Sequence, residues 1–179
     1  FSTRLAAELD ALIEAEGPDR VAAFFAEPVM GAGGVIPPPA GYFAKVQEVL
    51  VKHDVLFVAD EVICGFGRTG NMWGSQTYDI RPDLLTCAKQ LSSAYAPIAA
   101  LLIADHVYQT VADRSDELGT LGMGYTYGGH PVAAAVALKT LDIYEQDGII
   151  DHVRAVAPHF HSRLAALGDD PLGGEARGA

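Results

Sequence analysis

The 179-residue chain has few cysteines, few basic residues and no long apolar run. Its two cysteines, Cys64 and Cys87, are too few for the disulfide framework of a secreted domain of this size. Their spacing is also not that of a metal-binding Cys-x-x-Cys pair. We therefore expect two buried free thiols, no metal site and a reducing, cytoplasmic location.

The charge balance is strongly acidic, with 12 lysines and arginines against 23 acidic residues and a net charge of −11 at pH 7. Such a chain offers no broad cationic surface for nucleic acid or anionic lipid. No apolar run reaches the roughly 18 residues of a membrane-spanning helix, and the acidic N-terminal segment is not typical of a secretion signal. Nucleic acid and membranes are thus poor candidates as partners. Because the chain starts without methionine, we expect it to be a piece of a longer protein.

Apolar residues alternate between two patterns along the chain. Helical periodicity covers residues 5–13, 41–54, 131–144 and 150–167, and short continuous apolar runs predict strands at 21–26, 55–59, 84–88 and 97–104. Residues 29–39 are rich in glycine and proline, which predicts an irregular loop. Continuous apolar runs are typical of strands covered on both faces. The sequence therefore predicts an α/β domain with a mostly parallel sheet flanked by helices.

Three charged residues, Glu27, Asp60 and Lys89, directly follow predicted strands. The carboxyl ends of parallel strands share one edge of the sheet, where ligands bind in such folds. A carboxylate and an amine at neighbouring strand ends favour a cofactor site. Ordinary solvated charges, or an ion pair between Asp60 and Lys89, explain the same spacing, so the spacing leaves these interpretations open.

A glycine pattern gives an alternative interpretation. Gly65, Gly67 and Gly70 satisfy the G-x-G-x-x-G fingerprint of dinucleotide-binding proteins. That fingerprint must directly follow a strand and open a helix, yet several residues separate it from the strand at 55–59, and no helical periodicity follows Gly70. An NAD-binding oxidoreductase is accordingly a weak alternative.

Four longer segments carry a more specific signal: AEPVMGAGGVIPPPAGYF (26–43), DEVICGFGRTG (60–70), LLTCAKQLSSAYAPIAA (84–100) and YTYGGHPVAAA (125–135). Together, and in this order, they resemble the class III aminotransferases, which are pyridoxal-phosphate enzymes, and most of all the omega-amino-acid:pyruvate (omega-transaminase) branch. The resemblance implies an aspartate-aminotransferase-like, fold-type-I large domain that is incomplete in this chain. Residues 1–147 would belong to this large domain and residues 148–179 would start a C-terminal small domain.

The resemblance also implies roles for single residues. Lys89 matches the lysine that holds pyridoxal phosphate as a Schiff base and then moves a proton, and Asp60 matches the carboxylate that pairs with the protonated ring nitrogen. Val62 matches an aliphatic residue packed on the ring, and Glu27 a glutamate near the site. Thr126 matches a hydroxyl that reaches the phosphate bound by the neighbouring subunit of a homodimer.

The implied reaction moves an amino group from a primary amine or omega-amino acid to a keto acid such as pyruvate, by a ping-pong mechanism. A decarboxylase or aminomutase of the same fold, or a non-catalytic scaffold, stays open as an alternative. Because the family's enzymes are longer than this chain, the chain by itself is expected to hold an incomplete active site.

The chain departs from the family pattern at four positions. Ala32 stands where several members have a second glutamate, and its presence fits the omega-transaminase branch. Gln90, Ala94 and Ala99 replace expected glycines. Wherever the backbone there is left-handed, an alanine costs about 1 kcal/mol relative to glycine.

Overall fold

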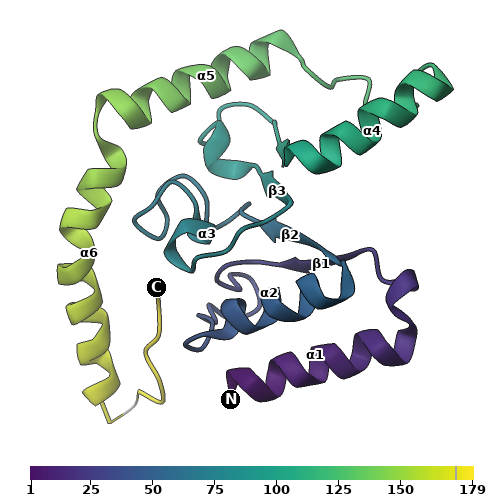
Figure 1. Cartoon of the computed structure of the whole chain (residues 1–179). Coiled ribbons are helices and arrows are strands. Elements are labelled where there is room, and N and C mark those ends of the chain that lie inside the picture. The colour runs from purple at the N-terminus through teal and green to yellow at the C-terminus, as the bar shows by residue number, and fades with distance from the viewer. Residues whose placement is uncertain (172) are drawn as a thin grey trace.

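The structure, a computed structural model, describes residues 1–171 and 173–179. Four strands make one sheet: β1 (Ala23–Ala26), β2 (Leu56–Asp60), β3 (Leu84–Cys87) and β4 (Ala100–Ile103). The helices are α1 (Ser2–Glu16), α2 (Tyr42–His53), α3 (Gly74–Thr77), α4 (Asp105–Leu118), α5 (Pro131–Gln146) and α6 (Ile149–Ala166). Short 3-10 turns cover Pro18–Arg20, Lys89–Leu91 and Leu167–Asp169. In Figure 1, α1 and α2 lie side by side below the sheet, while α5 and α6 run around its other side.

The sheet has the order β1-β2-β3-β4, in which the first three strands are parallel and β4 is antiparallel to β3. Helix α2 connects β1 to β2, so these elements form a βαβ unit. Ala26 pairs with Ala59, and Asp60 pairs with Thr86. The carboxyl ends of β1, β2 and β3 are therefore level with one another, and the predicted mostly parallel α/β sheet is confirmed.

The main core lies between the sheet and the helices α1 and α2. Apolar side chains from α1, α2, β2 and the adjoining loops meet there. The buried members of this core are Ile13, Phe43, Val46, Leu50, Val55, Phe57 and Ile80. The rings of Phe43 and Phe57 stack with their centroids 6.0 Å apart. The periodic apolar faces of residues 5–13 and 41–54 thus pack largely as the sequence predicts, with the exception of Leu12, which is 57% exposed.

The expectation that the strands are covered on both faces is correct only for β2, where Phe57, Val58 and Ala59 are at most 4% exposed. In β1, Phe25 is 69% exposed because it lies on the face opposite the core. All four residues of β4 are exposed as well. A continuous apolar run therefore does not show that both faces of a strand are covered by other residues of this chain.

Helix α4 was not predicted from the sequence. None of its residues is buried, and its apolar residues at helical spacing, Val107, Val111 and Leu118, were not used in the sequence prediction. The predicted division of the chain at residue 147 coincides with the turn at Asp147 and Gly148 between α5 and α6. That the two sides belong to different domains stays a prediction.

Within residues 1–171 and 173–179, no helix combines the length and apolarity needed to cross a bilayer.

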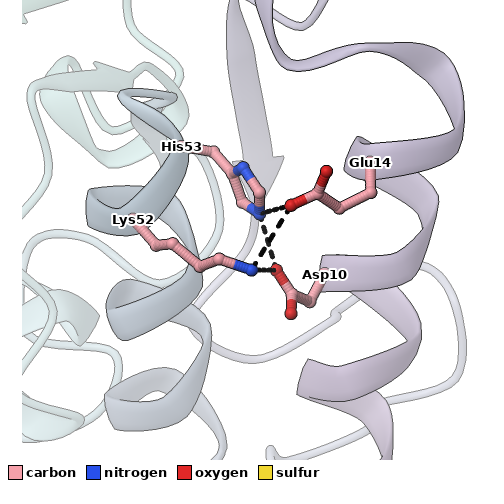
Figure 2. A network of polar contacts seen from close by, with 4 residues as sticks. All are labelled: Asp10, Glu14, Lys52 and His53. Carbon is pink, nitrogen blue, oxygen red and sulfur yellow. Dashed lines mark hydrogen bonds and ion pairs between the residues drawn. The ribbon is translucent and has the colours of Figure 1, made fainter.

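A charged network links the last turn of α2 to the middle of α1 (Figure 2). Lys52 Nζ lies 2.7 Å from Asp10 Oδ1 and 3.5 Å from Glu14 Oε1, and His53 Nε2 lies 2.6 Å from Asp10 Oδ1. Hydrogen bonds from Lys52 and His53 lower the pKa of Asp10 below its ordinary value of 3.8. The ligand atoms of Asp10, Glu14 and His53 lie within 4.8 Å of one another, but the Lys52 ammonium already contacts both carboxylates. The network therefore joins the two helices.

Replacing Asp10 by asparagine should lower stability in a pH-dependent way. Because folding lowers the pKa of Asp10, the ionised carboxylate stabilises the folded state above about pH 4, and this contribution is lost as the pH falls through the folded-state pKa. Urea unfolding should thus show a lower midpoint for Asp10→Asn at pH 7 and a shrinking difference in acid. Asp19→Asn, at an exposed position, is the control. A difference between wild type and Asp10→Asn that does not change with pH would contradict this account.

Candidate active site

Two of the predicted site residues meet at the carboxyl ends of β1 and β2. Glu27 directly follows β1 and Asp60 is the last residue of β2, and both line one cavity of about 500 Å³ with otherwise mostly apolar and aromatic walls. Glu27 Oε2 accepts a hydrogen bond from the Gly31 N–H at 2.9 Å. Glu27 therefore anchors the glycine-rich loop that follows it, as well as facing the cavity.

Asp60 is half-buried, and its carboxylate makes few polar contacts with the surrounding residues. Its Oδ1 accepts a hydrogen bond from the N–H of Val62 at 3.0 Å. No other hydrogen bond and no ion pair is made by this carboxylate within the described part of the chain. Within the described residues, Oδ2 is thus available to an external donor, and Val62 lies two residues further along the chain.

Lys89 opens the 3-10 turn after β3, three residues beyond Thr86, the partner of Asp60 in the sheet. Its φ of +45° is left-handed, and the residue is exposed. Among residues 1–171 and 173–179, its amine forms no ion pair or hydrogen bond. The alternative of an ion pair between Asp60 and Lys89 is therefore wrong, and Lys89 presents a free primary amine.

Thr126 lies in the exposed loop between α4 and α5. Over the described residues, no hydrogen bond links it to Glu27, Asp60, Val62 or Lys89. The structure thus brings four of the five predicted site residues to the ends of three neighbouring strands and does not join the fifth to them.

Glu61 is a residue of this region whose role the sequence interpretation missed. It is 0% exposed, and its carboxylate accepts hydrogen bonds from Gly74 N (2.9 Å), Ser75 N (2.6 Å) and Ser75 Oγ (2.5 Å). These bonds fasten the loop 61–73 behind Asp60. The signal available in the sequence was a second acidic residue directly after a buried strand.

The same loop contains the G-x-G-x-x-G match. The next helix, α3, starts only at Gly74 and has four residues, so Gly70 does not open a helix. Gly67 and Gly70 have φ of +95° and +83° and shape the turn itself. The loop therefore lacks the helix that a dinucleotide fingerprint requires.

Both cysteines are buried free thiols, as predicted. Burial raises the pKa of the Cys64 thiol to about 11, and burial also raises the pKa of Cys87. Cys64 Sγ lies 3.4 Å from both the N and the O of Val29. Since the thiolate is the reactive form, neither cysteine is a nucleophile near neutral pH.

The structure shows the backbone conformation at the three positions after Lys89 where the family pattern has glycine. Ala94 has a φ of +67°, whereas neither Gln90 nor Ala99 has a positive φ. Gln90 instead holds its side-chain Oε1 buried without a hydrogen-bond partner in the described structure. Of the three substitutions, only Ala94 occupies a backbone conformation that favours glycine.

Ala94→Gly should therefore stabilise the protein, by about 1 kcal/mol, because glycine adopts the left-handed conformation without the steric penalty of a Cβ. Ala99→Gly is the matched control, and there the greater freedom of unfolded glycine should lower stability by about 0.5–1 kcal/mol. Equilibrium urea unfolding measures both changes. Equal effects of the two substitutions would contradict the assignment of strain to Ala94.

Comparison with known proteins agrees with this arrangement. The family model described as "Aminotransferase class-III" matches residues 2–179. Over 178 residues the chain is 57% identical to "Gamma aminobutyrate transaminase 3, chloroplastic" of Solanum lycopersicum and 54% identical to "Vanillin aminotransferase" of Capsicum frutescens. These matches cover 99% of this chain but only 34% and 39% of the relatives.

Among solved structures, the omega transaminase of Pseudomonas jessenii in complex with PMP is 53% identical, with a TM-score of 0.97. The match covers 99% of this chain and 39% of that one. The chain thus spans little more than a third of the length of these proteins and has the fold of the matching part. It belongs to the class-III aminotransferase family.

Proposed function

We propose that the complete protein is a pyridoxal-phosphate-dependent omega-transaminase, which moves an amino group from a primary amine or omega-amino acid to a keto acid such as pyruvate. One observation carries this proposal. Within the described part of the chain, Asp60 has an unused carboxylate oxygen and Lys89 has an unpaired amine, and the two residues lie at the carboxyl ends of adjacent parallel strands. Class-III aminotransferases are pyridoxal-phosphate enzymes, so the proposal matches the family.

The side chains present fit this cofactor by their chemistry. Bound pyridoxal phosphate supplies an electron sink for negative charge that develops on the substrate carbon. In this proposal Lys89 Nζ would hold the cofactor covalently, and as a free amine it would move a proton to and from that carbon. The free oxygen of Asp60 holds the proton on the ring nitrogen as a charge-assisted hydrogen bond. Val62, half-buried beside Asp60, offers an aliphatic surface to the ring, and Glu27 stabilises the adjoining loop.

The substrate class is proposed from two lines of support. The name of the tomato relative gives gamma-aminobutyrate, whose amino group is remote from its carboxylate, and the Pseudomonas jessenii protein is named an omega transaminase. Ala32, where several members of the family have a second glutamate, fits the same branch. The donor's amino group would remain with the bound cofactor when the first carbonyl product leaves, and this retention gives the ping-pong order.

We also propose that the protein is a homodimer in which Thr126 serves the neighbouring subunit's site. Thr126 lies between Leu121, Met123, Tyr125 and Tyr127, whose side chains are 59% to 82% exposed and form an uncovered apolar loop. A hybrid of one Lys89→Ala subunit and one Thr126→Ala subunit should keep one fully active site, because the Lys89→Ala subunit supplies Thr126 to its partner. A hybrid without a fully active site would show that Thr126 acts in the site of its own subunit. Cytoplasmic location stays a prediction.

The test of the activity is an assay of the complete protein with pyridoxal phosphate, gamma-aminobutyrate or a simple primary amine, and pyruvate. We expect alanine to form together with the carbonyl product of the donor. Lys89→Ala should abolish alanine formation, whereas Lys139→Ala, at an exposed position of α5, should preserve it. If an alpha-amino acid is added as donor, release of carbon dioxide without alanine formation would identify a decarboxylase instead.

A further inference from the structure

A tyrosine on α5 reaches the segment that carries Lys89. The Tyr144 hydroxyl donates a hydrogen bond to the carbonyl oxygen of Gln90 at 2.7 Å and lies 3.2 Å from Ser93 Oγ. Gln90 directly follows Lys89, and Tyr144 is 54 residues further along the chain. One hydroxyl from a distant helix therefore contacts the middle residue of the 3-10 turn at Lys89–Leu91 and a residue just beyond the end of that turn.

The ring of Tyr144 is itself held in place. It stacks on Phe66 with centroids 6.0 Å apart and an interplanar angle of 26°, and Phe66 packs edge-on against Trp73 at 4.9 Å. Tyr144 also packs against the second buried cluster, which includes Leu85 and Cys87 of β3. The hydroxyl thus projects from a packed aromatic group, so its position is fixed relative to the strand that leads to Lys89.

The segment that it contacts is strained. Lys89, Ser93 and Ala94 have φ of +45°, +49° and +67°, a left-handed conformation that is unfavourable for a residue with a Cβ. Such strain persists only where the surroundings hold it. Inside the segment, Ser93 N donates to Gln90 O at 3.3 Å, so the same carbonyl accepts both the local bond and the bond from Tyr144.

We propose that Tyr144 is a positioning residue, which holds the Lys89 backbone in its left-handed conformation and so directs the amine toward the cofactor. This inference rests on the proposed function of Lys89. Tyr144→Phe keeps the ring and its packing and removes only the hydroxyl. Ser93→Ala removes the longer contact and leaves the 2.7 Å bond intact. The two variants therefore separate the contribution of each contact.

The test uses the complete protein without cofactor and two measurements. The first is the rate at which added pyridoxal phosphate becomes trapped on Lys89 by borohydride, measured by peptide mass. The second is amide hydrogen exchange of peptides covering residues 88–96. For Tyr144→Phe we expect trapping about tenfold slower and exchange about tenfold faster, the change that one lost hydrogen bond produces. Ser93→Ala should change each by less than about twofold. Tyr78→Phe, a half-buried ring whose hydroxyl has no hydrogen bond in the described structure, should leave both unchanged.

Two outcomes are informative in different ways. If Lys89 is trapped at the same rate in wild type and Tyr144→Phe, the positioning role is wrong, even if Tyr144→Phe unfolds at lower urea concentration. If Lys89 of the wild type is not trapped at all, the proposed function fails first, and the inference fails with it.

Discussion

Asp60→Asn is expected to reduce kcat of the complete protein by about 10²–10³-fold, because it removes the charge that holds the proton on the cofactor's ring nitrogen. Asparagine keeps an oxygen that can accept the N–H of Val62, so the turn after β2 should stay intact. The measurement is the steady-state rate of alanine formation by the cofactor-loaded protein at saturating amine and pyruvate. We also expect weaker retention of pyridoxal phosphate during dialysis.

Asp79→Asn is the matched control for this prediction. It removes one negative charge from an exposed position, where Asp79 lies 3.9 Å from the equally exposed Arg81. Activity of this variant should equal that of wild type. An Asp60→Asn variant with wild-type kcat would show that Asp60 is an ordinary strand-end charge, which was the open alternative from the sequence.

Glu61→Ala is expected to cost about 3–5 kcal/mol of unfolding free energy, because three donors on Gly74 and Ser75 would be left buried without an acceptor. Glu61→Gln should cost less, since one amide oxygen still accepts. Equilibrium urea unfolding of the cofactor-free protein measures both. Proteolysis within residues 61–73 should also accelerate for Glu61→Ala, because these bonds close that loop.

Glu48→Ala, on an exposed position of α2, is the control for the loss of a glutamate. It should stay within about 0.5 kcal/mol of wild type. A Glu61→Ala variant that unfolds within about 1 kcal/mol of wild type would contradict the structural role assigned to the buried carboxylate.

Much of this fold follows from the sequence because its strands and main helices carry strong local signals. The run at 55–59 becomes a strand buried on both faces, and the periodic residues around Val46 become the core side of α2. Helix α4 was missed although Val107, Val111 and Leu118 lie at helical spacing, and none of its residues is buried in this structure. The exposure of Phe25 depends on which parts of the chain are present to cover it, and local sequence does not contain that information.

Some residues of the candidate site could likewise be predicted from the sequence, and others could not. Strand ends are readable, so Glu27, Asp60 and Lys89 could be placed at one edge of the sheet before the structure was known. The burial of Glu61 and the reach of Tyr144 to Gln90 depend on tertiary contacts between distant segments. The left-handed conformation of Ala94 was foreseen only as a condition, since one residue type does not by itself report φ.

The most direct test of the central claim is to find where pyridoxal phosphate attaches. The complete protein is incubated with the cofactor, reduced with borohydride and digested, and the modified peptide is identified by mass. The account predicts one modification, on Lys89, that disappears in Lys89→Ala and persists in Lys139→Ala. Modification spread over several exposed lysines, or none, would contradict the assignment of Lys89 as the residue that holds the cofactor.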